Sequence, residues 1–186
     1  MKHIIQHNKI YFYLKIVTVF IVLPIFCDAQ EINLGSLKNL SASNGFGNIF
    51  LGENISLIPK SKLAYMDNDS IPDIDGCVKY EYRDLDRLKD DSNLDLDLVG
   101  IRVYKKKIIN IYLFFKREDG YQMFNSFEGN YGNYTERVTD FTYNWETESV
   151  KLHLEYNKED IGIAIYSCKK LYRELDQNKS NRFATQ

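Results

Sequence analysis

Residues 97–116, DLVGIRVYKKKIINIYLFFK, carry the clearest strand pattern in this 186-residue chain. Every second residue is apolar on both sides of a lysine triplet: Val99, Ile101, Val103, Ile109, Ile111, Leu113 and Phe115. Because successive side chains of a strand point to opposite faces, pairing Val103 with Ile109 places the whole set on one face. The stretch therefore predicts a β-hairpin whose three-residue loop, residues 105–107, leaves the lysines in solvent.

The chain after this hairpin predicts a short helix. Asp119 is a suitable N-cap, with Gln122 three residues further on. Aromatic side chains then recur at helical spacing and two glycines follow: Tyr121, Phe124, Phe127, Tyr131, Gly129 and Gly132. We expect this helix to pack on the sheet.

Three alternating segments further along predict an antiparallel meander. Their apolar sets are Phe141, Tyr143 and Trp145, then Val150, Leu152, Leu154 and Tyr156, then Ile161, Ile163 and Ile165. Four-residue loops would pair Trp145 with Val150 and Tyr156 with Ile161, which puts all three sets on one face. A helical stripe follows, at Cys168, Leu171, Tyr172 and Leu175.

These patterns predict the α+β class, with an antiparallel sheet of about six strands covered by one or two short helices. The sixth strand is residues 77–82, which alternate beside the hairpin, while residues 45–52 suit a short buried strand. A closed barrel is the alternative, and it requires the segment around Phe124 to be non-helical. We expect one domain over residues 30–178, loosely ordered up to Asn44, and a disordered tail over residues 179–186.

Residues 1–29 have the pattern of a secretory signal peptide. A basic leader to Lys15 precedes an apolar run from Ile16 to Phe26, and we expect cleavage after Ala29. The alternatives are a retained anchor, for which the run is short, and a lipoprotein signal at Cys27, where the preceding Phe26 is too large. The sequence thus predicts an exported protein, periplasmic or extracellular, with no membrane span after cleavage.

Export allows oxidation of the two cysteines of the mature chain. Cys77 and Cys168 are therefore a disulfide candidate, against the alternative of two separately buried thiols. Strand aromatics supply a second candidate site, a ligand platform, although such side chains also serve packing. Its members would be Tyr80, Tyr82, Tyr104, Tyr112 and Phe114.

Acidic residues gather between positions 67 and 97, where ten aspartates and one glutamate face four basic residues. Alternating carboxylates at the start of this segment give candidate calcium ligands, namely Asp67, Asp69, Asp73 and Asp75. An EF-hand loop would need other residues at Ile71, Pro72 and Val78, so a solvated acidic loop is the stronger interpretation. We expect residues 84–97 to form a charged, mobile connection.

Catalytic signatures are scarce in the mature sequence. Its one histidine, His153, lies on the polar parity of a strand and is expected at the surface. No nucleophile elbow or glycine-rich phosphate loop is present. The net charge of −2 disfavours a nucleic-acid partner.

The general order of elements resembles that of many exported bacterial proteins, too unspecifically to name a family. The leading hypothesis is a non-enzymatic exported module that binds a protein or envelope component through its sheet, without a cofactor unless calcium binds. The rival is a carboxylate-dependent hydrolase of envelope polysaccharide, because such an enzyme needs only two suitably spaced acids.

Overall fold

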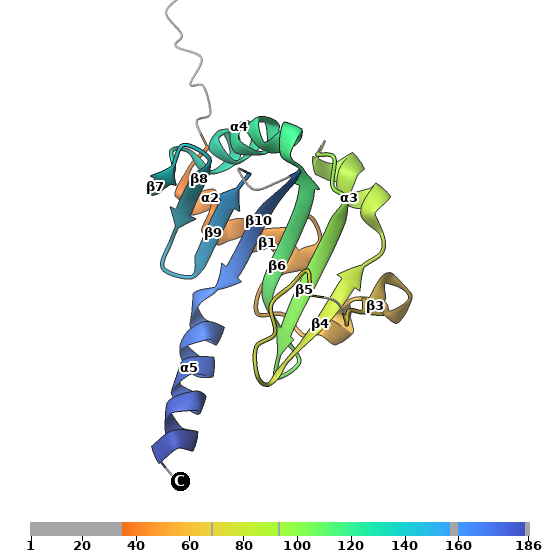
Figure 1. Cartoon of the computed structure of the whole chain (residues 1–186), viewed down its shortest axis with the longest axis vertical. Coiled ribbons are helices and arrows are strands. Elements are labelled where there is room, and N and C mark those ends of the chain that lie inside the picture. The colour runs from red at the N-terminus through yellow and green to blue at the C-terminus, as the bar shows by residue number, and fades with distance from the viewer. Residues whose placement is uncertain (1–34, 68, 93, 157–159, 185–186) are drawn as a thin grey trace, which may run out of the picture. The chain divides into compact units, whose positions relative to one another are not determined.

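The computed structural model describes residues 35–67, 69–92, 94–156 and 160–184, so the predicted signal peptide lies outside the described residues. An eight-stranded antiparallel sheet has the order β3-β4-β5-β6-β10-β9-β8-β7 (Figure 1). Its strands are β3 (Leu63–Tyr65), β4 (Cys77–Tyr82), β5 (Leu98–Tyr104), β6 (Lys107–Lys116), β7 (Glu136–Thr139), β8 (Thr142–Glu146), β9 (Val150–Glu155) and β10 (Ile161–Cys168). The α+β class is confirmed, with eight strands in place of about six.

Short helices and a second, two-stranded sheet complete the described part. They are α2 (Leu37–Ser43), β1 (Gly45–Phe46), β2 (Ile49–Phe50), η1 (Ile55–Leu57), η2 (Lys60–Lys62), α3 (Leu85–Ser92), η3 (Arg117–Asp119), α4 (Gly120–Tyr131) and α5 (Lys169–Ala184). Figure 1 shows α4 at one end of the strands and α5 leaving from the opposite end. Among the described helices, none has both the length and the apolar character needed to cross a membrane.

The central hairpin, β5 and β6, has the predicted register except near its turn. Ile101 pairs with Ile111, as expected, but Val103 pairs with Ile108 rather than Ile109. A bulge on β6 absorbs the extra residue and shortens the loop to Lys105 and Lys106, whose φ angles are 48° and 65°. Two successive residues with positive φ are typical of a tight type I′ hairpin turn, so the predicted three-residue loop is wrong.

The side chains of β10 point to the opposite faces of the sheet from those predicted. Leu154 pairs with Ala164 and Leu152 with Tyr166, so Gly162, Ala164, Tyr166 and Cys168 face inward. Glycine is required at position 162, because a Cβ atom there would lie 2.1 Å from the Phe115 ring. The isoleucines point to the other face, where Ile163 and Ile165 pack on a second apolar cluster and Ile161 is 58% exposed.

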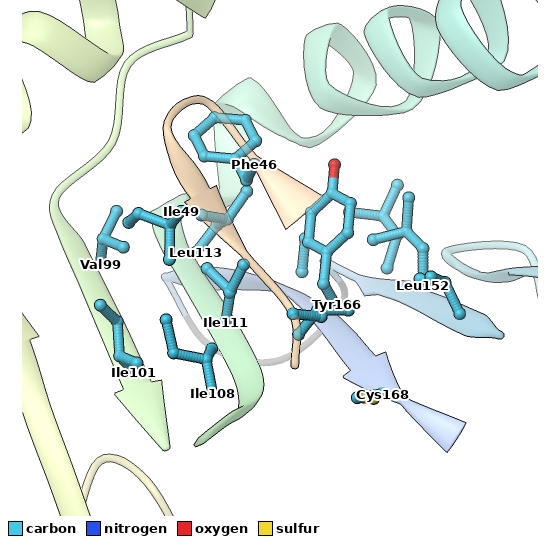
Figure 2. Close-up of a cluster of buried hydrophobic side chains, with 14 of the residues drawn as sticks. Phe46, Ile49, Val99, Ile101, Ile108, Ile111, Leu113, Leu152, Tyr166 and Cys168 are labelled. Atoms are coloured by element: carbon cyan, nitrogen blue, oxygen red, sulfur yellow. The ribbon is translucent and has the colours of Figure 1, made fainter. Parts of the chain in front are cut away.

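One face of the sheet, here called the covered face, holds the main hydrophobic core. Leu40 of α2, Phe46 and Ile49 of the small hairpin and Phe127 of α4 all pack on it. Figure 2 shows how Phe46 and Ile49 lie over the inward side chains of β6 and β10. Residues 35–52 therefore form an ordered cover, where a loosely ordered arm was expected up to Asn44.

The opposite face is partly covered by residues 69–76, here called the strap. Ile71 of the strap is fully buried and takes the space that a Cβ on Gly100 would need. The ammonium group of Lys79 donates to the Ile71 carbonyl (3.0 Å) and lies 2.7 Å from the Asp73 carboxylate. Arg102, which is 2% exposed, donates to the Pro72 carbonyl. Two inward cations thus fasten an acidic segment to the sheet.

Two segments expected to be mobile or disordered have regular structure. Residues 85–92 form α3, and buried leucines at positions 88, 94 and 96 attach the predicted mobile connection to the core. Helix α5 continues through Ala184, beyond the predicted start of the disordered tail. Asn178 in that helix donates to the Tyr104 hydroxyl at 2.8 Å, which attaches α5 to β5.

The predicted disulfide is wrong, because Cys77 and Cys168 are both thiols. Strands β4 and β10 are separated by the whole β5–β6 hairpin. Three strand spacings amount to roughly 14 Å, whereas a disulfide requires Cα atoms within about 7 Å. Reordering of the sheet would be needed to join these two residues.

We expect Leu152→Ala to lower the free energy of unfolding by about 2–5 kcal/mol, because it leaves a cavity at a fully buried position. Lys151→Ala, at the neighbouring half-buried position, should change it by less than about 0.5 kcal/mol. Urea denaturation of both variants measures the difference. Similar losses in the two variants would contradict the orientation of β9.

The separation of the cysteines predicts that Cys77 and Cys168 do not form a disulfide bond with each other in the folded protein. Alkylation of the unfolded protein without reductant should label the peptides that contain Cys77 and Cys168, as mass spectrometry would show. Cross-linked peptides that lose two hydrogens would contradict the strand order between β4 and β10.

Candidate functional site

A pocket of about 690 Å³ opens where several elements meet at one end of the sheet. We call it the end pocket, and its lining residues are Lys116, Arg117, Glu118, Tyr121, Phe141, Tyr156 and Asp160. They come from the end of β6, from η3, from the first turn of α4 and from residues flanking β8, β9 and β10. The pocket therefore depends on the whole arrangement of the central strands.

Main-chain hydrogen bonds hold these flanking residues together. The Tyr156 N–H donates to the Phe141 carbonyl at 3.2 Å, and the Arg117 N–H donates to the Asp160 carbonyl at 2.9 Å. Each bond continues a strand pairing by one residue past its end. The walls of the end pocket are thus extensions of the sheet.

Aromatic rings form the apolar part of the end pocket. The rings of Phe141 and Tyr156 meet edge to face, with centroids 5.6 Å apart, and Tyr143 stacks behind Tyr156 at 6.4 Å. Helix α4 begins with Gly120 because a Cβ there would lie 2.3 Å from the Tyr156 ring. This close approach fixes Tyr156 against the helix, beside Tyr121.

Unusual exposure distinguishes Tyr121 and Phe141 from ordinary packing residues. Tyr121 is 69% exposed, Phe141 is 43% exposed, and nearby Ile161, which pairs with Lys116, is 58% exposed. Apolar side chains gathered at a hollow and rimmed by charges are typical of an interaction site. The rim here carries two cations and two carboxylates, so it favours neither sign of charge.

The end pocket changes the acidity of one phenol. Burial, followed by the neighbouring Tyr143, raises the pKa of Tyr156 from its ordinary 10.0 to about 12. The hydroxyl of Tyr156 therefore stays protonated at neutral pH and is available as a hydrogen-bond donor or acceptor.

The predicted calcium ligands do not form a site in the described part of the chain, where no cluster of three metal-ligating side chains occurs. Asp67, Asp69, Asp73 and Asp75 are all exposed. Asp73 pairs with Lys79, and the strap turns its apolar Ile71 inward instead of closing around a cation.

The predicted aromatic platform is divided between the two faces. Tyr80 and Tyr82 belong to the core side, whereas Tyr112 and Phe114 stack on each other on the strap side. Tyr82, Tyr104 and Tyr112 are at most 5% exposed, so these side chains serve packing. Burial also raises the pKa of Tyr112 far above its usual range.

His153 is half-buried on the strap side of β9 and belongs to a polar chain. Its Nδ1 lies 2.9 Å from Asn144 Oδ1, and Asn144 Nδ2 donates to Glu136 at 2.7 Å. Glu155 lies 3.7 Å from the other ring nitrogen. The histidine is thus part of an ordered network, not the simple surface residue that was expected.

The sequence pattern did not identify the end pocket. Tyr121 follows the helical spacing of the apolar residues of its segment, and Phe141 follows the strand alternation of its own. Both patterns predict a place in the core. The buried side of α4 is in fact Gly120, Met123, Phe127 and Tyr131, which leaves Tyr121 outside it. The one feature of the sequence that could have indicated the pocket is the location of its aromatic residues. Tyr121, Phe141 and Tyr156 each lie where an apolar run meets a charged turn.

Comparison with known proteins returns no match: no family model, no curated protein and no solved structure is similar to this chain. Function must therefore be argued from the chemistry of the site.

The raised pKa of Tyr156 predicts a pH dependence of stability. A group with a higher pKa in the folded state stabilises the fold fully below its unfolded pKa, and this contribution disappears as the pH rises from 10 to about 12. Tyr156→Phe should therefore lose less unfolding free energy across this window than the parent protein, in urea titrations at pH 9.5 and pH 12. Identical losses would show that the Tyr156 phenol is solvated.

Proposed function

We propose that this protein is an exported, non-enzymatic binding module whose end pocket holds a hydroxyl-rich ring, such as a sugar unit of an envelope or extracellular polysaccharide. The observation that carries the proposal is the aromatic group of exposed Tyr121 and Phe141 with half-buried Tyr156, within a rim of mixed charge.

The chemistry of a sugar fits both parts of this pocket. Its C–H faces are apolar and flat enough to pack on aromatic rings. Its hydroxyls both donate and accept, so carboxylates such as Glu118 and cations such as Lys116 can each find a partner. A balanced rim disfavours polyanions, including nucleic acids.

Export is inferred from the pattern of residues 1–29, which lie outside the described residues. A periplasmic or extracellular protein meets polysaccharides of the envelope directly. This setting supports the choice of a glycan over a cytosolic small molecule.

The test is isothermal titration of the mature protein with chitohexaose, cellohexaose and soluble peptidoglycan fragments. At least one should bind, and Tyr121→Ala or Phe141→Ala should weaken its binding about tenfold, the effect of losing one aromatic contact of about 1.4 kcal/mol. Tyr65→Ala is the matched control, because Tyr65 on edge strand β3 is also 69% exposed. Equal loss in all three variants, or no binding by any glycan, would refute the proposal.

The rival activity, a carboxylate hydrolase, is favoured by one observation: Glu118 and Asp160 line the same pocket. Two carboxylates that flank a bound sugar can act as acid and base or nucleophile. Chromatography of the incubated glycans decides between the two functions. Cleavage that disappears in Glu118→Gln or Asp160→Asn would replace the binding module by an enzyme, whereas intact glycans in every sample would exclude the hydrolase for these substrates.

A further inference from the structure

A second hollow, of about 470 Å³, lies over the covered face and is separate from the end pocket. We call it the tyrosine pocket. Its walls are α2, the β1–β2 hairpin and α4, and Tyr166 of β10 contributes from the sheet. Figure 2 shows the Tyr166 ring standing away from β10, with its hydroxyl pointing toward α4 beside the Phe46 hairpin. A volume of this size is within the range of small-molecule sites.

Aromatic rings hold the inner end of the tyrosine pocket in a fixed geometry. Phe127 meets Tyr166 edge to face at 6.1 Å and 87°, and Phe46 approaches the same ring to 6.1 Å. Tyr131 packs edge to face on Tyr166, with the centroids 6.5 Å apart. These four side chains are at most 8% exposed, so the inner end of the pocket is closely packed.

Two phenol hydroxyls meet there, and their hydrogen bonding is incomplete. The oxygens of Tyr131 and Tyr166 lie 3.1 Å apart, and either can donate to the other. Each hydroxyl has one proton, so a single shared hydrogen bond uses one of the two protons. Within the described part of the chain, neither oxygen has a further protein acceptor in reach. Burial raises the pKa of Tyr166 well above 10, which keeps its proton in place at neutral pH.

The other described residues that line the tyrosine pocket carry no charge. Its polar members are uncharged, and three of them donate to the main chain: Asn39 to the Asn130 carbonyl, Asn130 to the Ser126 carbonyl and Ser43 to the Leu40 carbonyl. Among the described residues that line the tyrosine pocket, none has an acidic, basic or histidine side chain. A charged ligand would lose its hydration without gaining an ionic partner, which is costly.

We propose that the tyrosine pocket binds a small uncharged ring compound with an oxygen acceptor, which receives the second hydroxyl proton of the Tyr131–Tyr166 pair. The rings supply apolar contact, the phenols fix the orientation of the ligand, and α2 with the β1–β2 hairpin covers it. This inference is independent of glycan binding at the end pocket.

The test uses three probes of similar shape: benzamide, which is neutral with a carbonyl acceptor, benzoate, which is charged, and toluene, which has no acceptor. Titration of the mature protein followed by two-dimensional NMR should show benzamide shifting the ring resonances of Tyr131 and Tyr166, with benzoate much weaker. Tyr131 is the member of the pair that reaches the pocket, since it is 8% exposed and Tyr166 is fully buried. In Tyr131→Phe, benzamide affinity should fall about fivefold, as expected for one lost hydrogen bond, while toluene affinity is unchanged. Tyr65→Phe, on edge strand β3 and outside both pockets, is the control and should leave both affinities unaltered.

Tyr166→Phe is the matched variant, because it removes a fully buried phenol and leaves the Tyr131 proton free to donate, so benzamide affinity should be retained. If Tyr131→Phe does not fold, the comparison of benzamide with benzoate in the parent protein still tests the pocket. The proposal is overturned if benzamide shifts neither phenol, if benzoate binds as tightly as benzamide, or if folded Tyr131→Phe binds benzamide as the parent does.

Discussion

The structure depends above all on how β10 lies between β6 and β9. This strand joins the β5–β6 hairpin to the β7–β9 strands, and its pairing with both neighbours completes the eight-stranded sheet. With Tyr166 inward, its ring meets Phe46, Phe127 and Tyr131, and so brings the small hairpin and α4 onto one face. The same register leaves Ile161 exposed beside the end pocket. Both candidate binding sites therefore follow from the position of one strand.

A second constraint is the burial of cations on the strap side. Lys79 and Arg102 are direct cross-strand neighbours, an arrangement that repulsion disfavours. Groups from the strap and from β6 offset it. The strap gives the Ile71 and Pro72 carbonyls and the Asp73 carboxylate. Strand β6 gives Asn110 Oδ1, 3.1 Å from Arg102, and the Tyr112 ring, whose centroid lies 5.0 Å from the guanidinium carbon. The acidic strap is thus part of the fold, because its negative charge lies beside two buried positive groups.

Alternation and helical spacing predicted the elements whose two faces differ in hydrophobicity, and failed at β10, where both sets of alternate residues contain apolar side chains. The hairpin around Ile101 and Ile111, the helix at Phe127 and the inward parity of Leu152 are all as predicted. Strand β10 offers isoleucines on one parity and Ala164 and Tyr166 on the other, so hydrophobicity alone assigned it to the wrong face. Only the proximity of Phe115 to Gly162, a tertiary contact, decides the matter. The end pocket was missed for a related reason, since an exposed aromatic at the end of a strand has the same local pattern as a buried one. The cysteine pairing failed because strand order is not encoded in local spacing.

The register of β10 is tested most directly by backbone nuclear Overhauser effects in the isotope-labelled protein. The account predicts contacts from Tyr166 to Leu152 on one side and to Ile111 on the other. Contacts that join Ile165 to Leu152 instead would turn the isoleucines inward, remove Tyr166 from the core and contradict the account of both pockets.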